Sequence, residues 1–483
     1  MKITHISAEC YPAAKAGGLG DVVGALPKYL NKERHQAEVI LPYYHTDWLK
    51  SVDKELVFEG EYPFKSKNIS FAVHRVDKST LGFDLYLIDI PGRFDRPGIY
   101  IDPWSGHPYW DEMERFFSFQ IASLEWLGTR QKSPDVIHCH DHHTALVPFM
   151  MKECFRFERF NDIPSILTIH NGEYQGRYPA DVYHTLPAFN LDNLGILEWD
   201  GGLNCLASGI KSAWKVSTVS EGYMQELLEF CNGLEQLLQH EESKTKGIVN
   251  GIDVDVWNPK TDPLIESNFT ASSVVKGKEK NKKALLDHFS IPGDRPLFSF
   301  IGRLVREKGA DLLPDAIAAC HEQGVNAAFI VLGTGEPSLH NIFKKLESDY
   351  VGYFDSRLEY NEKLAHQIYA GSDFLMMPSR VEPCGLNQFY AMRYGTIPLV
   401  RRVGGLADTV VDISQKDGYG IVFDNFNLDE IVEAIKRAVD MFNKKELFEG
   451  DRKKVMKLDF SWKRSTKEYI DLYKSVIPKK QNK

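Results

Sequence analysis

The chain has 483 residues, of which 43% are hydrophobic and 26% are charged, values typical of a globular protein. A chain of this length predicts two or three domains rather than a single core. The formal net charge of -9 at pH 7 gives no long-range attraction to nucleic acid, so we expect no nucleic acid partner. No apolar run reaches the roughly 18 residues that a membrane-spanning helix requires, so we expect no membrane partner.

Seven cysteines are scattered along the chain, and none forms a C-x-x-C pair. Their odd number and irregular spacing indicate reduced, mostly buried thiols. The chain begins with the strand-like residues "MKITHISAEC" and shows no signal or transit peptide. We therefore expect a cytoplasmic location.

One histidine-rich run, "HCHDHH" at residues 138–143, raises the question of a metal site. His138 and His140 alternate along a predicted strand, so they share one face of it. Four well-placed ligands, which a zinc site wants, cannot be counted from this run. We therefore predict no metal among the site residues.

Taken in chain order, short apolar runs alternate with segments of helix length. The first run is followed by a predicted helix with Val22, Val23, Leu26 and Leu30 in helical period. Alternation of this kind indicates βαβ units on a parallel sheet. The predicted strands of the N-terminal half occupy residues 2–8, 37–44, 134–141, 164–172, 215–222 and 246–252.

The pattern begins again after a polar stretch at residues 258–283. A hinge between two domains is predicted near residues 250–262. The predicted strands of the C-terminal half occupy residues 296–304, 327–335, 350–357, 373–380 and 396–405. Ligand-binding loops in such sheets lie at the carboxyl ends of the strands, where most of the glycine-rich and polar clusters of this chain fall.

The tail has the period of an amphipathic helix, with Trp462, Tyr469, Leu472 and Val476 on one face. The predicted organisation is an N-terminal domain over residues 1–247, a C-terminal domain over residues 248–460 and a terminal helix over residues 461–483. The predicted fold class is α/β, with two Rossmann-like domains.

The stretch "AKAGGLGDVV", residues 14–23, places three glycines between a predicted strand and a helix. It is not a dinucleotide fingerprint, because the third glycine would fall at Val23 and the acid Glu38 stands at the start of its strand. Two interpretations remain. The loop and the helix N-terminus bind an anion, or the glycines form a plain turn.

Two further loops carry similar chemistry in the C-terminal half. "GRLVREKG", residues 302–309, places Arg303 and Lys308 after a strand, where they either grip a diphosphate or form a solvated turn. "RRVGGLADTV", residues 401–410, repeats a glycine pair before a helix.

Six segments together resemble bacterial-type glycogen and starch synthases, in order and spacing, almost from end to end. They are "KAGGLGDVVGALPKYL", "HCHDHHTAL", "TIHNGEYQG", "VNGIDVDVWNP", "GRLVREKG" and "PSRVEPCGLNQFYAMRYGTIPLVRRVGGLADTV". The resemblance implies the GT-B architecture, in which two Rossmann-like domains face a deep interdomain cleft and the terminal helix returns to the N-terminal domain.

The resemblance also implies the reaction. A retaining hexosyltransferase of this family moves glucose from a nucleotide sugar, with ADP-glucose favoured over UDP-glucose, to the nonreducing end of an α-1,4-glucan. No cofactor is implied, because fixed cations can stabilise the leaving diphosphate and the chain lacks a convincing D-x-D metal site. Two other interpretations stay open: a glucan- or nucleotide-binding regulator that has lost catalysis, and a transferase of the same fold with a different acceptor.

The resemblance assigns site residues by their positions in these motifs. The implied catalytic residues are Asp21, Asp141, His170, Arg303, Lys308 and Glu382. The implied substrate-binding residues are Lys15, Gly18, Asn250, Tyr360, Cys384, Gly385, Leu386, Gly404 and Gly405.

The implied roles divide between the donor and the glucose. Arg303 and Lys308 hold the diphosphate, the loop amides of Gly404 and Gly405 cradle phosphate, and Tyr360 stacks on the base. On the other side, Lys15 contacts donor phosphate or sugar, and Gly18 offers its backbone amide to the donor. Glu382 binds the glucose hydroxyls and His170 lies beside the glucose. Asn250 lies at the hinge, and Asp21 and Asp141 are the acids of their motifs.

The chain departs from the family pattern at several positions near the implied site. Ala16 replaces a threonine, His142 replaces a tryptophan after Asp141, and Val403 replaces a threonine. Gly172 and Glu173 replace apolar residues. These changes bear mostly on the acceptor side and leave the charged set intact. Tyr390 stands where many related transferases have a second glutamate, as it does in glycogen synthases.

Overall fold

The computed structural model describes residues 1–293 and 295–478, and the chain divides into two compact units. The first unit contains Met1–Val219, Met224–Ile248 and the C-terminal segment that begins at Trp462. The second contains Ser220–Tyr223 and Val249–Ser461. The terminal helix thus belongs to the first unit, and the polar stretch at residues 258–283 belongs to the second.

The first unit is built on a nine-stranded sheet of order β12-β11-β7-β6-β1-β2-β5-β4-β3 in the described chain. All neighbours from β12 to β5 pair in parallel, whereas β5, β4 and β3 pair antiparallel. The strands are β1 (Lys2–Ile6), β2 (Gln36–Pro42), β3 (Glu55–Phe64), β4 (Lys67–Val76), β5 (Asp84–Asp89), β6 (Val136–His140), β7 (Ser165–Ile169), β11 (Lys215–Thr218) and β12 (Thr245–Gly247). Strands β3, β4 and β5 were not among the predicted ones.

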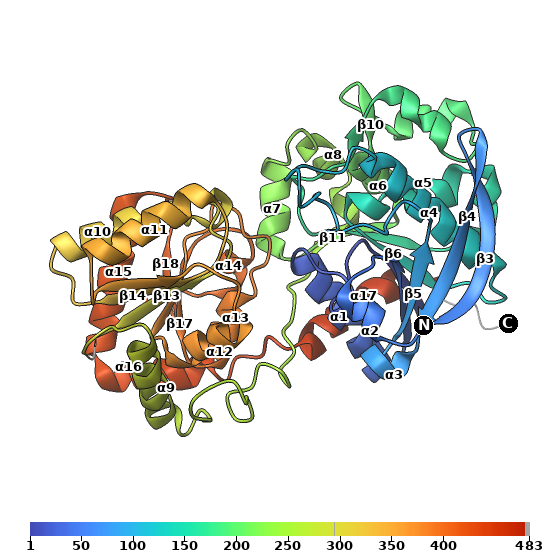
Figure 1. Ribbon diagram of the computed structural model, residues 1–483. Coiled ribbons are helices and arrows are strands. Elements are labelled where there is room, and N and C mark those ends of the chain that lie inside the picture. Colours follow the sequence, from blue (N-terminus) through green and yellow to red (C-terminus); the bar gives the residue numbers. More distant parts are fainter. Residues whose placement is uncertain (294, 479–483) are drawn as a thin grey trace. The chain divides into compact units, whose positions relative to one another are not determined.

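Helices cover both faces of this sheet (Figure 1). One face packs on α1 (Gly18–Lys32) and on the C-terminal α17 (Trp462–Val476), and the core between them also includes residues of β1, β6 and β7. The other helices of the unit are α2 (Asp47–Ser51), α3 (Lys78–Leu81), α4 (Glu112–Thr129), α5 (Leu146–Glu153), α6 (Cys205–Ser212) and α8 (Glu235–His240). A small antiparallel sheet adds β8 (Arg177–Tyr178), β10 (Gly202–Asn204) and β9 (Glu198–Trp199).

The predicted apolar face of the tail is confirmed in α17, which ends at Val476, whereas residues 479–483 of the predicted terminal helix lie outside the described residues. All four residues of the predicted apolar face, Trp462, Tyr469, Leu472 and Val476, are buried in the core that α17 shares with α1. The hydroxyl of Tyr473 also hydrogen-bonds Nδ1 of His138 on β6, at 2.8 Å. The end of the chain therefore supplies part of the first unit's interior.

The second unit contains a parallel six-stranded sheet of order β15-β14-β13-β16-β17-β18 among the described residues. Its strands are β13 (Leu297–Ile301), β14 (Ala328–Leu332), β15 (Phe354–Arg357), β16 (Phe374–Met377), β17 (Ile397–Arg401) and β18 (Ile421–Phe423). Five of them lie within predicted strands, and β18 was missed. Because right-handed crossovers run outward in both directions from β13, helices cover both faces of the sheet.

Helices α10 (Leu313–Glu322) and α11 (Pro337–Asp349) lie on one side of this sheet, and α9 (Val274–His288) and α12 (Glu362–Gly371) on the other (Figure 1). The remaining helices are α13 (Asn387–Arg393), α14 (Gly404–Thr409), α15 (Leu428–Asn443) and α16 (Lys445–Val455). One further helix, α7 (Glu221–Glu229), spans a point where the chain passes between the units. No helix in the described residues is long and apolar enough to cross a bilayer.

The polar stretch at residues 258–283 is packed rather than extended. Trp257 stacks between Tyr390 and His366, at 3.8 and 4.0 Å between ring centroids. Asp262 is buried and accepts a hydrogen bond from Nδ1 of His366 at 2.7 Å. Lys278, on α9, donates to the carbonyls of Tyr369 and Tyr394 at 3.1 Å each. The charged side chains here are anchors of the second unit, which composition alone did not reveal.

We predict that Tyr469→Ala destabilises the first unit by about 3 kcal/mol, because truncating a large buried aromatic ring leaves a cavity. Tyr469 is 0% exposed. Urea unfolding would measure this loss as a lower midpoint for the first unit. Lys467→Ala, on the exposed face of the same helix, is the control and should unfold like the wild type. Equal midpoints for Tyr469→Ala and the wild type would show that α17 is only loosely docked.

Candidate active site

The strand order reverses at one point in each sheet, between β1 and β6 and between β13 and β16. The loops that leave the carboxyl ends of two such strands run in opposite directions and open a crevice, which is where open α/β sheets bind ligands. In the first unit Lys15, Gly18 and Asp21 follow β1, and Asp141 follows β6. His170 follows the next strand, β7.

The second unit repeats this arrangement. Arg303 and Lys308 follow β13, and Glu382 follows β16. Most remaining predicted residues follow the same edge: Tyr360 after β15, Cys384, Gly385 and Leu386 after β16, and Gly404 and Gly405 after β17. The structure thus places each predicted cluster at the ligand-binding edge of its own sheet.

Glu9, which sequence reasoning missed, organises the glycine loop after β1. Its side chain is buried, and its Oε2 accepts the backbone N–H groups of Ala16 and Gly17 at 2.6 and 2.8 Å. Its Oε1 accepts the hydroxyl of Tyr100 at 2.8 Å. The Glu9 carboxylate therefore accepts hydrogen bonds from two backbone N–H groups of the loop, which we predicted as possible ligands of a bound anion. The feature of the sequence that could have indicated this role is an acidic residue inside the strand-like run "HISAEC".

Gly18 stands just beyond the part of the loop that Glu9 holds. It is the first residue of α1, where backbone N–H groups have no partner within the helix. Its φ lies outside the left-handed region, and a Cβ added there would meet nothing within 4 Å. The turn itself therefore does not require glycine at position 18. The nearby Lys15 and Asp21 form an ion pair, with Nζ 2.7 Å from Oδ1.

A pocket of about 420 Å³ lies beside this loop within the first unit. Lys15 and Ala16 form one side, and Arg96 and Tyr100 contribute to the rest. Because Tyr100 also donates to Glu9, the loop and the pocket wall are held by the same carboxylate. Lys15, which pairs with Asp21, and the departure at Ala16 both line this pocket.

Asp141 joins the ends of β6 and β7. Its φ of +57° is in the left-handed region, and its Oδ1 accepts the N–H groups of His170 at 2.7 Å and of Asn171 at 3.4 Å. Burial raises the pKa of Asp141 to about 7, although the two backbone N–H groups favour the ionised form. Asp141 therefore positions the backbone of His170.

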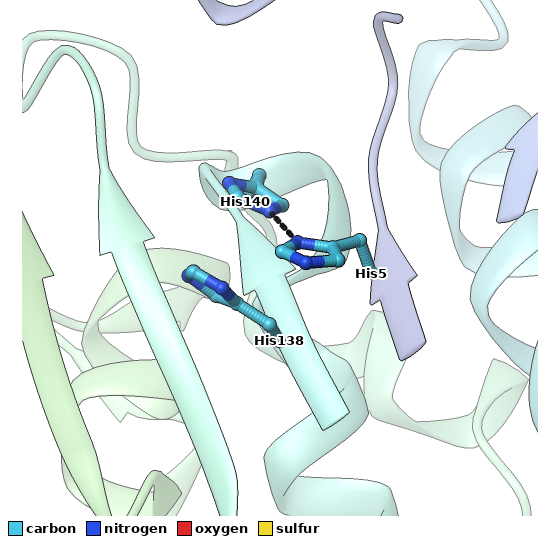
Figure 2. A group of neighbouring side chains, drawn as sticks. All are labelled: His5, His138 and His140. Atoms are coloured by element: carbon cyan, nitrogen blue, oxygen red, sulfur yellow. Dashed lines mark hydrogen bonds between the residues drawn. The ribbon is translucent and has the colours of Figure 1, made fainter. Parts of the chain in front are cut away.

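A chain of buried histidines runs behind His170. Nε2 of His170 lies 3.1 Å from Nδ1 of His140. Nε2 of His140 in turn lies 3.0 Å from Nδ1 of His5, and Figure 2 shows this second contact. Burial lowers the pKa of His5 and of His170 to about 3, so these rings stay neutral near pH 7. Each neutral ring has one donor and one acceptor nitrogen, so a single choice of tautomer sets the whole chain.

His5, at the far end of the row of hydrogen-bonded histidines, determines which tautomer each ring adopts. Nε2 of His5 is buried and has no hydrogen-bond partner among the described residues. A lone pair left unpaired there is less costly than an unpaired N–H group. This assigns the proton of His5 to Nδ1, which donates to His140. His140 in turn donates from Nδ1 to Nε2 of His170, which leaves His170 with its own proton on Nδ1.

The partly buried Lys308 and the buried Glu382 form the centre of the second unit's candidate site. Nζ of Lys308 lies 2.8 Å from Oε1 of Glu382, and Oε2 of Glu382 accepts the hydroxyl of Ser379 at 2.9 Å. Burial opposes the charge of Lys308, but the Glu382 and Glu307 carboxylates outweigh it and raise the pKa of Lys308. Arg303 is more exposed, and its Nη2 lies 3.3 Å from Glu307. Two cations are thus held at one strand end.

Gly405 is required by close packing rather than by its backbone angles. A Cβ at this position would lie 2.3 Å from the carbonyl oxygen of Cys384. The N–H of Gly405 donates to the carbonyl of Glu382 at 3.0 Å, so this amide is already paired. Gly404 begins α14 with a φ of +42°, in the left-handed region. The glycine pair therefore ties α14 to the loop that carries Glu382.

The other predicted residues of the second unit differ in exposure. Tyr360 is 83% exposed, in the turn between β15 and α12. Asn250 and Cys384 are buried, and Oδ1 of Asn250 has no hydrogen-bond partner in the described chain. Leu386 directly precedes α13, next to Gly385 in the left-handed region.

Comparisons with known proteins agree with this arrangement. A family model described as the starch synthase catalytic domain matches residues 2–240, and one described as glycosyl transferases group 1 matches residues 281–449. A glycogen synthase of Flavobacterium johnsoniae is 46% identical over 481 residues, which cover 99% of this chain and 100% of the relative. A glycogen synthase of Streptococcus pneumoniae is 38% identical over 491 residues, with 99% and 100% covered.

Solved structures give the same result. The catalytic domain of starch synthase IV from Arabidopsis thaliana, bound to ADP and acarbose, is 33% identical, with a TM-score of 0.87 and 99% of both chains covered. Sucrose-phosphate synthase from Thermosynechococcus elongatus is 16% identical, with a TM-score of 0.60 and 98% of both chains covered, and shares the fold alone.

These matches define the class as a glycosyltransferase built from two Rossmann-like domains, the GT-B architecture. Within that class, the chain belongs to the glycogen and starch synthase family of retaining glucosyltransferases. The family, the fold class and the type of enzyme predicted from the motifs are thereby confirmed.

We predict that Gly18→Ala leaves the melting temperature unchanged and lowers turnover by about 100-fold. The structure has room for the methyl group, whereas a donor lying against the loop would be displaced by on the order of 1 Å. Thermal melts and steady-state kinetics on the same preparation would test this. Gly128→Ala is a control, because its added Cβ also meets nothing within 4 Å and it is remote from the loop in sequence. Normal turnover in Gly18→Ala would contradict a donor contact at this glycine.

Proposed function

We propose that this protein transfers glucose from ADP-glucose to the nonreducing end of an α-1,4-glucan, with retention of configuration. The observation that carries the proposal is the partly buried Lys308–Glu382 pair beside Arg303, at the point of strand reversal in the second unit. The preference for ADP-glucose over UDP-glucose is supported by the related Arabidopsis starch synthase, which was solved with ADP and acarbose.

Arg303 and Lys308 stabilise the leaving diphosphate. Negative charge builds on the phosphate oxygens as the bond to glucose breaks, so fixed cations aimed at them favour the transition state over the ground state. Glu382 holds Nζ of Lys308 in place before the donor arrives, and it is also the group that binds the glucose hydroxyls. Cys384, Gly385 and Leu386 continue the same loop.

The remaining donor contacts come from loops of the second unit. Gly404 and the N-terminus of α14 face the phosphates, since a helix N-terminus favours an anion. The exposed ring of Tyr360 stacks on the nucleotide base. Asn250 lies in the chain segment that enters the second unit. Its buried Oδ1 is available to accept a hydrogen bond from the substrate.

The first unit supplies the groups around the transferred glucose. The amide of Gly18 and the side chain of Lys15 contact the donor, and Asp21 orients Lys15 through their ion pair. Asp141 holds the backbone of His170, whose carbonyl steadies the positive charge on the sugar. The acceptor hydroxyl attacks from the face of the leaving phosphate, and its proton passes to a phosphate oxygen. No cofactor takes part in this scheme.

A regulator that binds glucan or nucleotide without catalysis is the second candidate function, and a transferase with another acceptor is the third. The intact charged set of Arg303, Lys308 and Glu382 favours an enzyme. A cytoplasmic location is part of the proposal, and it is supported by seven cysteines that are all buried free thiols.

A donor panel separates these candidates. Release of nucleoside diphosphate from ADP-glucose and UDP-glucose would be measured with glycogen present and absent. We expect release from ADP-glucose that depends on glycogen. Binding without release would identify a regulator. Release of nucleoside diphosphate that does not depend on glycogen but increases with another sugar would identify a different acceptor.

We predict that Lys308→Ala and Arg303→Ala each lower turnover at least about 100-fold, because each removes a cation aimed at developing charge. Initial rates with saturating donor would measure the loss. Lys344→Ala is the control, since Lys344 is an exposed cation of α11 that pairs with Glu347 of the same helix. Near-normal rates in both Lys308→Ala and Arg303→Ala would exclude these residues as the diphosphate grip.

A further inference from the structure

Three metal-ligand side chains converge behind the loop that carries Asp141. Glu112 is the first residue of α4, and His142 and His143 lie in the short helix that directly follows Asp141. One ligand atom from each residue lies within 4.8 Å of the other two. We propose that Glu112, His142 and His143 form a binding site for Zn²⁺. This proposal does not depend on the proposed function.

Both histidines present a buried nitrogen that nothing else uses. His142 and His143 are each 7% exposed, and neither Nδ1 atom has a hydrogen-bond partner among the described residues. The ring of His142 is bonded from its other side to the backbone of Tyr174, and this bond favours the protonated ring. The proton of His142 therefore sits on Nε2 and donates to the Tyr174 carbonyl, which leaves a lone pair on the buried Nδ1.

The protonation states suit a metal ligand. Burial lowers the pKa of His142 to about 4 and the pKa of His143 well below its usual value, so both rings are neutral near pH 7. A neutral imidazole binds a metal ion without first losing a proton. Burial also raises the pKa of Glu112, which a cation bound beside the carboxylate would reverse.

The ligand set selects the ion. Two imidazole nitrogens and one carboxylate oxygen, with a fourth position left open, form a set that Zn²⁺ uses, whereas Mg²⁺ and Ca²⁺ take mainly oxygen ligands. Ligand atoms around a tetrahedral Zn²⁺ lie about 3.4 Å apart. A small closure of the three side chains therefore brings them onto one ion. The two rings already pack together, with 3.7 Å between their centroids.

Cys205 lies at the margin of this group. A Cβ built on Gly176 would lie 2.8 Å from Cδ2 of His142 and 3.2 Å from Sγ of Cys205, so the ring and the thiol flank the same glycine. Burial, and then the charge of Glu112, raise the pKa of the Cys205 thiol. The fourth position of the ion is accordingly filled by water or by this sulfur.

A second histidine group nearby is not equivalent. His5, His138 and His140 also bring ligand atoms within 4.8 Å of one another (Figure 2). However, both nitrogens of His138 are bonded to hydroxyls, of Tyr473 and Thr168, and both nitrogens of His140 are bonded to other rings. An ion here would break several buried hydrogen bonds, each of which leaves a polar group unpaired.

An ion at Glu112, His142 and His143 would fasten the start of α4 to the residue after Asp141. Because the unfolded chain holds these ligands apart, binding stabilises the folded first unit. His142 is also a departure from the family pattern, which has tryptophan at this position. The site is therefore a property of this chain rather than of the motif.

The test measures metal binding directly, without an activity assay. The full-length protein would be stripped with a chelator, dialysed, and titrated with Co²⁺ under reducing conditions, since Co²⁺ reports low-coordinate nitrogen and oxygen sites by strong visible absorption. Competition with Zn²⁺ then gives the Zn²⁺ affinity and stoichiometry. We expect one equivalent per chain and a higher melting temperature with Zn²⁺.

Two variants and one matched control locate the site. His142→Trp restores the family residue, and Glu112→Gln keeps the shape of the side chain but removes the charge. Both should weaken binding at least about tenfold and abolish the thermal shift, while circular dichroism confirms folding. His5→Asn, in the rival group, keeps a donor toward His140 and should bind like the wild type. No binding by the wild type, unchanged binding in both variants, or loss in His5→Asn would each overturn the proposal.

Discussion

Strands of a parallel sheet all end at the same edge, and this constraint governs where chemistry can occur in this protein. In each unit the strand order reverses once, and the loops beside that reversal carry the charged and glycine-rich segments. The β1 and β6 loops hold Lys15 and Asp141, and the β13 and β16 loops hold Lys308 and Glu382. Residues far apart in sequence become neighbours because the sheet brings their strand ends together.

At these edges the chain satisfies many of its own charges before any ligand is present. Glu9 takes two amides of the first glycine loop, and Glu382 pairs with Lys308. A cation that a carboxylate already holds in place needs no rearrangement when negative charge develops beside it, which is the condition for electrostatic preorganisation.

Much of the fold was predictable because its determinants are local. Apolar runs of strand length identified most parallel strands, and the helical period of Trp462, Tyr469, Leu472 and Val476 identified α17. The hairpin β3–β4 was missed because few of its residues are buried and polar side chains interrupt its apolar ones. The burial of Lys278 was also unpredictable, since its partners are backbone carbonyls of distant loops.

In the candidate site, too, local features were predictable from the sequence, whereas contacts between distant segments were not. Motifs located Lys308, Glu382 and Asp141, because spacing within a loop is a local property. Glu9 and the histidine chain behind His170 were missed, since their partners come from strands that are neighbours only in the folded sheet. The "HCHDHH" run could not be resolved from sequence for the same reason. Its third ligand-bearing neighbour, Glu112, lies on a helix that precedes the strand.

The position of α17 has a consequence for how the protein is made. The core of the first unit includes Trp462, Tyr469 and Tyr473, which leave the ribosome after every residue of the second unit. Domains generally fold in the order of synthesis, but here the first unit must wait with an open apolar face while the second is completed. Translation of the last segment therefore closes a surface that was exposed throughout synthesis. A chain that stops short of Trp462 would leave the ribosome with that surface uncovered, as a substrate for chaperones.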